Sequence, residues 1–291
     1  MKRKSFIVFI LSLVLTAAIL CACTQETAIK QNNQTLSVHF LDVGQGDSAF
    51  IELPNGETML IDTGENYHGE GIIRYIERLG YSQIDYLVGT HPHSDHIGSM
   101  PYIIRHFPVR QIYMPRVSAD SKLFETLLES IQNAGLTVKE GKAGVSILQD
   151  GDLSADILAP VTIDEDNLNN CSLVIRLRFG GTSFLMTGDA GPDELNAVAQ
   201  DLHADVLKVM HHGSSVSATQ EVLERIAPKT AVISCGADND YGHPHRETLY
   251  YLEQLGCTVY RTDRDKTVVV TTDGTNISVK TNQDSIARAT Q

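Results

Sequence analysis

Cysteine and tryptophan are scarce in this 291-residue sequence, which has five cysteines and no tryptophan. Two of the cysteines, Cys21 and Cys23, lie close to the amino terminus, which leaves Cys171, Cys235 and Cys257 for the rest of the chain. These three form no CxxC pair and are odd in number. The cysteine pattern therefore indicates neither a disulfide framework nor a thiolate zinc site.

Positive charge is also scarce, because 23 lysine and arginine residues face 36 aspartate and glutamate residues, for a formal net charge of −13. A surface of this sign does not attract polyanions by itself. Tight binding of nucleic acid would need a local basic patch. The candidates are Arg105, Arg110 and Arg116, for which a solvated surface position is the simpler interpretation. The 42% hydrophobic content nevertheless allows a substantial core, which argues against disorder over most of the chain.

The amino-terminal apolar run, residues 6–20, is shorter than the roughly 20 residues that a membrane span needs. It follows a basic start (MKRK), and this combination is typical of an export signal. The sequence LCAC at residues 20–23 resembles a bacterial lipobox in which Cys23 is lipidated. We therefore expect a lipoprotein signal peptide over residues 1–22, a flexible tether over 23–35, and an exported protein held by lipid at the outer face of the bacterial cell membrane. An ordinary cleaved signal peptide and an N-terminal anchor are the alternatives.

From Leu36 onwards, short β-rich runs alternate with turn residues and with helical spacing of apolar residues. Strands are predicted at residues 36–43, 47–53, 57–64, 85–91, 155–160, 172–179, 182–189, 204–213, 230–236, 258–262 and 267–273. Helices are predicted near residues 72–79, 121–134, 193–202, 220–226 and 247–255. The two halves have a similar order and no linker divides them. We therefore predict one α/β domain over residues 36–280, with two sheets packed face to face and helices outside, followed by a polar tail at 281–291.

The segment HPHSDH gathers four side chains that can bind metal, His91, His93, Asp95 and His96, after a predicted strand and before a helix. Three imidazoles and one carboxylate fit nitrogen and oxygen ligation of Zn²⁺ or a similar ion. The spacing allows His91 and His93 to reach one metal ion while Asp95 and His96 reach a second. A histidine-rich turn that simply faces solvent is the alternative interpretation.

An HxHxDH segment placed after a strand resembles the signature of the metallo-β-lactamase superfamily, and the resemblance spans nearly the whole chain after the tether. Further segments resemble the ComEC-type branch, which includes the extracytoplasmic metallohydrolase domain of DNA-uptake channels and free-standing secreted relatives. These segments are FLDVGQGDS at 40–48, IDTG at 61–64, NNCSLVIRL at 169–177, TGD at 187–189, VMHHGS at 209–214 and YGHP at 241–244. The resemblance implies a four-layer αββα sandwich with a dinuclear metal centre.

The same resemblance implies that Asp189 bridges the two metal ions, although a lone aspartate at a strand end is otherwise a turn or cap residue. His211 and His212 end another apolar run, so only one of them is expected to point towards the centre. We favour His212 as the ligand of the second metal, because Gly213 and Ser214 follow it as in related motifs, and His211 stays open as the alternative.

The sequence departs from many superfamily members in the segment before TGD. Where they supply a third histidine to the first metal, this chain has Asn169 and Asn170. Asparagine is a poorer zinc ligand, so water completes the first site or the site is weaker. We therefore expect two divalent ions, with Zn²⁺ as the first choice and Mn²⁺ as the alternative, and place Asn170 among the residues that support the site.

The remaining candidates support the ligands or the substrate. Asp62 is expected to orient a ligand imidazole, and Asp47 to lie near the centre on a loop that resembles the rim of the family's site. We place Asp95 among the catalytic residues with His243, which could hold the substrate or protonate a leaving group, while His245 could contact the substrate. Turn carboxylates and surface histidines are the simpler interpretations of these positions.

Hydrolysis is the reaction class that such a centre implies. The leading hypothesis is a phosphodiesterase or nuclease of the ComEC-like type that acts on nucleic acid or a cell-wall polymer. The alternatives are an esterase that releases phosphocholine from teichoic acid, a β-lactam or lactone hydrolase, and a non-catalytic surface lipoprotein that binds metal. The sequence indicates no protein partner.

Overall fold

The computed structural model describes residues 35–282. The expected signal peptide, the lipidation site Cys23 and the tether up to residue 34 lie outside the described residues, as does nearly all of the tail. Among the residues described, no helix is long and apolar enough to cross a membrane.

The strands form two sheets. The first sheet has eight strands in the order β15-β14-β1-β2-β3-β4-β5-β6, and the second has seven in the order β13-β12-β11-β10-β9-β8-β7. The strands of the first sheet are β1 (Leu36–Phe40), β2 (Ala49–Glu52), β3 (Thr58–Ile61), β4 (Ile84–Val88), β5 (Val109–Met114), β6 (Val138–Glu140), β14 (Thr267–Thr272) and β15 (Ile277–Asn282). Those of the second are β7 (Ser146–Asp150), β8 (Leu153–Ala159), β9 (Val174–Phe179), β10 (Thr182–Met186), β11 (Val206–Lys208), β12 (Thr230–Ile233) and β13 (Thr258–Arg261).

The strands are apolar on both faces because each sheet packs on a second layer at either side. On β3, Met59 joins the core between the sheets, whereas Leu60 joins the core under the helices of the first sheet. On β10, Phe184 joins the core between the sheets, whereas Leu185 packs towards the helices of the second sheet. Because neighbouring strand residues point to opposite faces, this pattern places three apolar layers between four structural ones.

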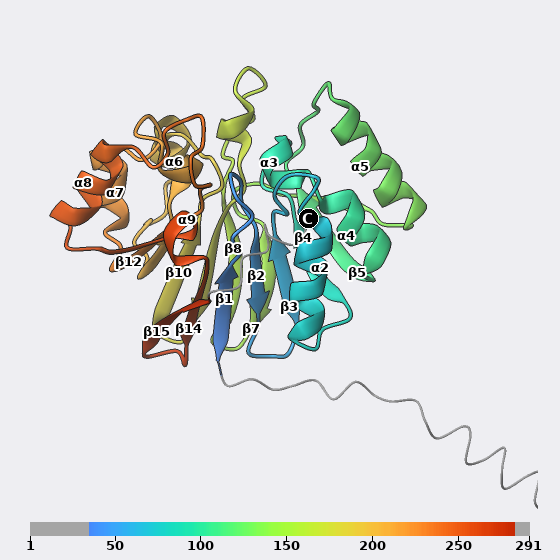
Figure 1. Ribbon diagram of the computed structural model, residues 1–291, viewed down its shortest axis with the longest axis horizontal. Coiled ribbons are helices and arrows are strands. Elements are labelled where there is room, and N and C mark those ends of the chain that lie inside the picture. Colours follow the sequence, from blue (N-terminus) through green and yellow to red (C-terminus); the bar gives the residue numbers. More distant parts are fainter. Residues whose placement is uncertain (1–34, 283–291) are drawn as a thin grey trace, which may run out of the picture. The chain divides into compact units, whose positions relative to one another are not determined.

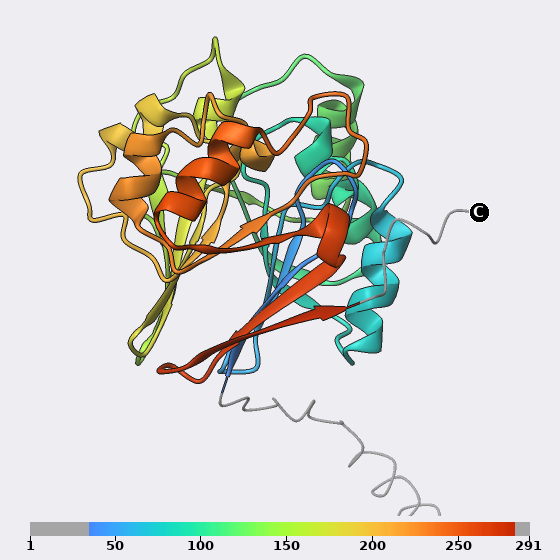
Figure 2. The ribbon, with the colours of Figure 1, turned by 60° about the vertical axis from the view of Figure 1, so that its left-hand side comes forward.

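Helices cover the outer face of each sheet (Figures 1 and 2). On the first sheet lie α2 (Gly69–Arg78), α4 (Met100–His106) and α5 (Lys122–Asn133). On the second lie α6 (Pro192–Ala197), α7 (Gln220–Ile226) and α8 (Arg246–Gln254). The short helices α3 (Ser94–Ile97) and α9 (Thr262–Asp265) follow β4 and β13. The predicted αββα sandwich is confirmed.

The strands predicted at 36–43, 57–64, 85–91, 182–189 and 230–236 each end three residues earlier than expected. Two further predicted elements differ more in extent. The run 204–213 is a strand only over β11, after which the chain turns into a 3₁₀ helix, Met210–Gly213. The helix predicted at 193–202 ends at Ala197, because Val198 has an extended backbone. Val198 and Leu202 are nevertheless buried, so their apolar spacing reflects packing of an irregular segment and not of a helix.

The topology brings the ends of several strands to one edge of the sandwich. β3 and β4 run parallel in the first sheet, and β10, β11 and β12 run parallel in the second. The carboxyl ends of parallel neighbours meet at the same edge of a sheet. Asp62, His91, Asp189 and His212 all follow such strand ends. The fold therefore gathers residues from distant parts of the chain where the two sheets meet.

Candidate metal centre

The HPHSDH segment leaves β4 and enters α3 with its imidazoles close together. The ring centroids of His91 and His96 lie 4.1 Å apart, and both side chains are fully buried. His91 Nε2 lies 3.0 Å from Nδ1 of His93, which is the residue before α3. Three histidines of this segment therefore converge, as the sequence predicts, and do not form a turn that faces solvent.

Asp189, buried at the end of the β10 segment, lies between the histidines of the two sheets. Its Oδ1 is 3.2 Å from His96 Nε2, and its Oδ2 is 3.6 Å from His212 Nε2 and 4.0 Å from His91 Nε2. A carboxylate with neighbours on both oxygen atoms can serve two cations at once. Asp189 therefore lies between the two groups of candidate ligands, and its role as a bridging ligand stays a prediction.

Asp95 and His212 complete a compact group around His96. Asp95 Oδ2 lies 3.1 Å from His212 Nε2 and 3.8 Å from His96 Nε2. One ligand atom from each of Asp95, His96, Asp189 and His212 lies within 4.8 Å of the others. This group corresponds to the second predicted site, while His91, His93 and Asp189 stand where the first was predicted.

The two adjacent histidines differ in what they face. His211 and His212 have left-handed backbones, with φ of 48° and 54°, a conformation that non-glycine residues rarely adopt and that costs about 1–3 kcal/mol. His212 is buried beside Asp95 and Asp189. His211 Nε2 is 3.7 Å from Asp189 Oδ2, but its Nδ1 hydrogen-bonds the Ser217 hydroxyl at 3.0 Å. The geometry favours His212 as the ligand and places His211 at the rim.

The inward-facing imidazoles share one arrangement, in which Nδ1 contacts the protein and Nε2 faces the centre. His212 Nδ1 donates to the Ser234 carbonyl at 3.0 Å. His96 Nδ1 lies 2.8 Å from Asp62 Oδ2. Nδ1 of His91 contacts the hydroxyls of Thr90 and Ser172, each at 3.2 Å. A carbonyl or carboxylate partner places the hydrogen on Nδ1 and leaves Nε2 free as a ligand.

Buried carboxylates dominate the electrostatics of the centre. Burial alone would lower the pKa of His96, but the carboxylates of Asp189 and Asp95 raise it well above its usual range. For His212, burial is likewise outweighed by Asp189, and the pKa rises to about 10. The buried carboxylates therefore require nearby positive charge, which protons on the imidazoles supply in the absence of metal.

The donor atoms fit a pair of divalent cations. Asp189 Oδ1 and His96 Nε2 are both buried without a hydrogen-bond partner among the described residues, although they lie 3.2 Å apart. Buried polar atoms without partners are rare unless an ion or water serves them. Imidazole nitrogen and carboxylate oxygen are ligands that both Zn²⁺ and Mn²⁺ accept. The unpartnered atoms of Asp189 and His96 therefore fit the divalent metal ions that the sequence implies.

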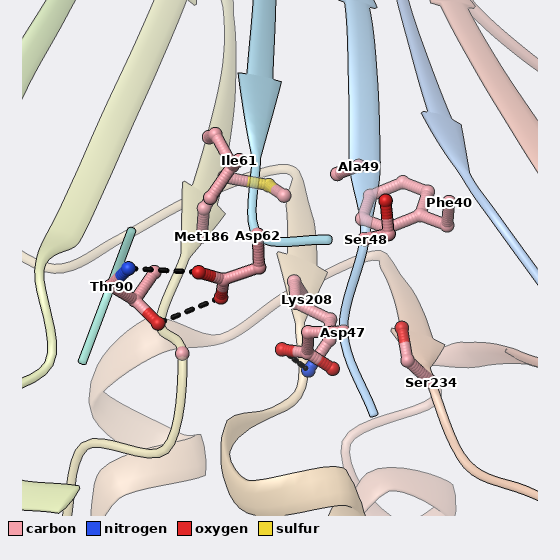
Figure 3. A pocket seen from close by; sticks show the side chains of 11 residues that line it. Phe40, Asp47, Ser48, Ala49, Ile61, Asp62, Thr90, Met186, Lys208 and Ser234 are labelled. Carbon is pink, nitrogen blue, oxygen red and sulfur yellow. Dashed lines mark hydrogen bonds and ion pairs between the residues drawn. The ribbon is translucent and has the colours of Figure 1, made fainter. Parts of the chain in front are cut away.

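Asp62 contacts Nδ1 of His96, the imidazole that it was expected to orient. Its two carboxylate oxygens accept hydrogen bonds from the backbone N–H and the hydroxyl of Thr90, at 2.8 and 2.7 Å (Figure 3). Asp62 has φ of 57°, so the strand turns sharply where it delivers this carboxylate. Thr90 thus fixes Asp62, and Asp62 in turn fixes His96.

Sequence reasoning missed Lys208, which contacts Asp47 beside the candidate ligand His212. Its side chain is 3% exposed, and Nζ is 2.8 Å from Asp47 Oδ2 (Figure 3). Asp47 Oδ1 lies 3.3 Å from His212 Nδ1, so Asp47 is near the centre, as expected. A lysine within the apolar run VLKVM was the available signal, because an isolated charge at a buried strand position needs a partner.

The glycine-rich loop between β1 and β2 holds Asp47 in place. The Asp47 N–H donates to the Asp95 carbonyl at 3.0 Å. A Cβ on Gly46 would lie 2.5 Å from that same carbonyl oxygen, and the φ of Gly46 is 141°. Only glycine permits this approach. The GQGD sequence therefore positions Asp47 against the backbone of the HPHSDH segment.

The other predicted residues lie further from the ligand atoms. The Asn170 amide donates to Asp164 Oδ2 at 2.9 Å, and Ser172 is the residue of that segment that contacts His91. His245 Nδ1 accepts hydrogen bonds from Ser215, which ties two loops together. We find no contact of Asn170 with the inward-facing histidines among the hydrogen bonds and ion pairs of the described residues.

His243 lies closest to the centre among the predicted substrate residues. Its ring centroid is 5.7 Å from that of His211 and 6.2 Å from that of His212. Nδ1 is buried without a hydrogen-bond partner among the described residues. Burial, followed by the charge of His212, lowers the pKa of His243 to about 4. At neutral pH His243 is therefore a neutral imidazole beside the candidate ligands.

Comparison with known proteins agrees with this geometry. Residues 41–237 match the profile of the family described as the Metallo-beta-lactamase superfamily. The chain is 36% identical over 251 residues to ComE operon protein 3 of Bacillus subtilis, covering 79% of this chain and 32% of that protein. It is 30% identical over 253 residues to Recombination protein 2 of Haemophilus influenzae, covering 84% of this chain and 30% of that protein. The chain thus spans about a third of the length of these curated relatives.

The fold is also found in solved structures. CmlA, a diiron β-hydroxylase from Streptomyces venezuelae, superposes with a TM-score of 0.50 and 18% identity, over 78% of this chain and 52% of that one. At this level of identity the similarity concerns the fold alone.

Proposed function

This chain belongs to the metallo-β-lactamase superfamily and is related to competence proteins, and we propose that it hydrolyses phosphodiesters at a centre of two divalent metal ions. The observation that carries the proposal is the position of Asp189, with oxygen atoms 3.2 Å from His96 Nε2 and 4.0 Å from His91 Nε2. One carboxylate between two groups of ligands supports a shared centre better than a single structural ion. Structural zinc sites, by contrast, hold one ion with four ligands of its own and need no carboxylate between two groups.

Asp95, His96, Asp189 and His212 would hold one cation, and His91, His93 and Asp189 the other. Such a pair of cations, when bound, lowers the pKa of a shared water towards neutrality and draws negative charge from a substrate oxygen. The protein's part is to present the imidazoles of His91, His96 and His212 through Nε2, which the contacts at Nδ1 accomplish.

His243 would act on the substrate side of the centre. A neutral imidazole at neutral pH can accept a proton or donate a hydrogen bond to a leaving oxygen. Its unpartnered Nδ1 and its distance from His211 and His212 support a role beside the ligands and not among them. Asp95, which is part of the ligand group, would remain both a ligand and a contributor to catalysis.

Nucleic acid is the substrate that we favour, because the relatives are named as competence and recombination proteins. The net charge of −13 opposes strong attraction of a polyanion. The candidate basic patch gives little help, since Arg105 donates to Ser130 and Arg110 pairs with Glu57. The cations themselves would then supply most of the attraction for phosphate, and we expect weak binding. Teichoic acid esters and β-lactams are the competing substrates.

We also propose that the protein acts outside the cytoplasm, held to the membrane by lipid at Cys23. The lipobox-like sequence LCAC supports this proposal. Metabolic labelling with a palmitate analogue tests it. Label in the full chain but not in Cys23→Ala is expected, and label that survives the substitution would disprove lipidation at Cys23.

Turnover of model substrates tests the reaction class. We expect the protein to hydrolyse bis-p-nitrophenyl phosphate and single-stranded DNA with added Mn²⁺ or Zn²⁺, and to lose this activity with a chelator or in Asp189→Asn. Nitrocefin and a phosphocholine ester measured beside them report the competing classes. Hydrolysis of one of these two in place of the phosphodiesters would reassign the substrate, and inactivity on all four would favour the metal-binding surface protein.

A further inference from the structure

We propose that Lys208 is a positioning residue of the metal centre, a fixed internal cation that holds Asp47 against His212. The inference rests on the proposed metal binding and adds to it a residue that contacts neither substrate nor a ligand atom.

The burial of Lys208 is the first observation. Its side chain is 3% exposed at the end of β11, between the two sheets, and its neighbours in the cavity are shown in Figure 3. Lysine is almost never fully buried unless it is paired, because removing an ammonium ion from water is strongly unfavourable. The contacts of Lys208 must therefore offset that cost.

Both contacts of Lys208 lead towards the centre. Nζ lies 2.8 Å from Asp47 Oδ2 and donates to the Val209 carbonyl at 2.8 Å. Val209 is the residue from which the chain turns into the 3₁₀ helix that carries His212. One ammonium group thus restrains a carboxylate on the β1–β2 loop of the first sheet and the backbone that leads to a candidate ligand of the second.

The second carboxylate oxygen of Asp47 lies beside the imidazole of His212. Asp47 Oδ1 is 3.3 Å from His212 Nδ1, whose hydrogen is donated to the Ser234 carbonyl, and Nε2 of the same ring is 3.1 Å from Asp95 Oδ2. A carboxylate beside an imidazole N–H makes Nε2 more basic and fixes the orientation of the ring. Lys208 therefore acts on the ligand atom through Asp47 and His212.

The charge of Lys208 also disfavours a third metal ion beside Asp47, Asp62 and His96. Oxygen or nitrogen atoms of Asp47, Asp62 and His96 lie within 4.8 Å of one another, a spacing that suits a cation. The Lys208 ammonium already stands 2.8 Å from Asp47 in that group. Repulsion between the ammonium and a further divalent ion there disfavours its entry.

The experiment measures Co²⁺ binding to the full chain, because Co²⁺ reports ligand geometry through its visible absorption and needs no turnover. We expect Lys208→Met to bind Co²⁺ about 10–100-fold more weakly than the wild type and to change the spectrum. Asp47→Asn should show a loss of similar size. The double variant should be no weaker than Asp47→Asn alone, since Lys208 acts through Asp47.

Lys229→Met is the matched control, because Lys229 also pairs with an aspartate, Asp205, at 2.8 Å, but at the other end of β11 and with 76% of its side chain exposed. We expect wild-type Co²⁺ affinity in this variant. Unchanged or tighter Co²⁺ binding by Lys208→Met, or additive losses in the double variant, would overturn the proposal.

Two further variants keep the test decisive if Lys208→Met does not fold. Lys208→Arg retains the positive charge and should retain the Co²⁺ spectrum, whereas Asp47→Asn, which retains Lys208, should lose affinity. Wild-type Co²⁺ affinity in Asp47→Asn would reject the positioning role of Lys208. A wild-type protein that binds Co²⁺ with this coupling but hydrolyses no phosphodiester would refute the proposed function alone.

Discussion

The Nδ1 atom of His96 lies 2.8 Å from Oδ2 of Asp62, on the side of the imidazole opposite to the candidate metal ligands. Asp62 is 1% exposed and is itself held by two hydrogen bonds from Thr90. The carboxylate is therefore placed to act on a metal ion through His96.

Asp62→Asn should weaken metal binding about 10–100-fold, because an amide is a poorer acceptor for the His96 N–H and carries no charge. Isothermal titration with Mn²⁺ measures the effect. Asp85→Asn is the control, since Asp85 is also a buried carboxylate that accepts from a threonine, Thr58, but at the start of β4. Equal affinities in Asp62→Asn and the wild type would show that the carboxylate only serves the local fold.

The adjacent histidines should differ in their effect on metal binding. His212→Ala removes a buried imidazole whose Nε2 lies 3.1 Å from Asp95, so we expect one of the two metal equivalents to be lost at micromolar metal. His211→Ala removes a ring that is 27% exposed and hydrogen-bonded to Ser217, and we expect both metal equivalents to remain. Metal content after desalting measures the difference, and the reverse pattern would make His211 the ligand.

Metal binding should stabilise the fold. A cation at about 100 times its dissociation constant stabilises the native state by about 2.7 kcal/mol if the unfolded chain does not bind it. For a domain of this size we therefore expect a rise in Tm of about 5–10 °C on adding Mn²⁺ to chelator-treated protein. Asp189→Asn, which lacks the shared carboxylate, should show a much smaller rise. A Tm that does not depend on metal in the wild type would contradict tight binding.

The sequence predicted which side chains converge where the candidate ligands are contiguous or end a strand. His91, His93 and His96 belong to one short motif, and the end of an apolar strand places Asp189 at the sheet edge. Sequence could not decide between His211 and His212 by the alternation of strand side chains. The backbone leaves the strand at Val209, and both residues are left-handed, so the rule no longer applies there.

Lys208 shows why the surroundings of the centre were harder to predict than its ligands. Its partner Asp47 lies on the loop between β1 and β2 of the other sheet, and only the packing of the two sheets brings the ammonium and the carboxylate to 2.8 Å. A similar limit applies to Ser172. A serine after the NNC sequence offers no sign that its hydroxyl lies 3.2 Å from His91 Nδ1. Long-range pairs of this kind depend on topology and not on local pattern.

Acid should destabilise the metal-free protein through His68. Burial lowers the pKa of His68 to about 4, against about 6.5 in an unfolded chain. The unfolded state therefore takes up the proton first, so the contribution of His68 to stability is complete above pH 6.5 and is lost as the pH falls through 4. We expect a loss of about 3 kcal/mol over that range.

The free energy of unfolding at pH 7.5 and pH 4.5, with chelator present, measures the contribution of His68. Its decrease should be smaller in His68→Gln than in the wild type. His106→Gln is the control, because His106 is 43% exposed and pairs with Glu77 on the surface. Identical pH dependence in the wild type and His68→Gln would show that His68 does not titrate as expected.

If nucleic acid is the substrate, Tyr241 should contribute to binding by stacking on a base. Tyr241 is 68% exposed, and its ring stacks at 18° and 5.5 Å on His243, beside the candidate ligands. Stacking of a base on an aromatic side chain contributes about 1–3 kcal/mol. Tyr241→Ala should therefore lower kcat/KM for a single-stranded oligonucleotide by about 5–150-fold, and much less for an abasic strand of equal length.

The control is Tyr250→Ala, which removes a tyrosine that is 56% exposed on α8 and should leave kcat/KM unchanged for both strands. Equal losses on both strands would show that Tyr241 orders its loop instead of contacting a base.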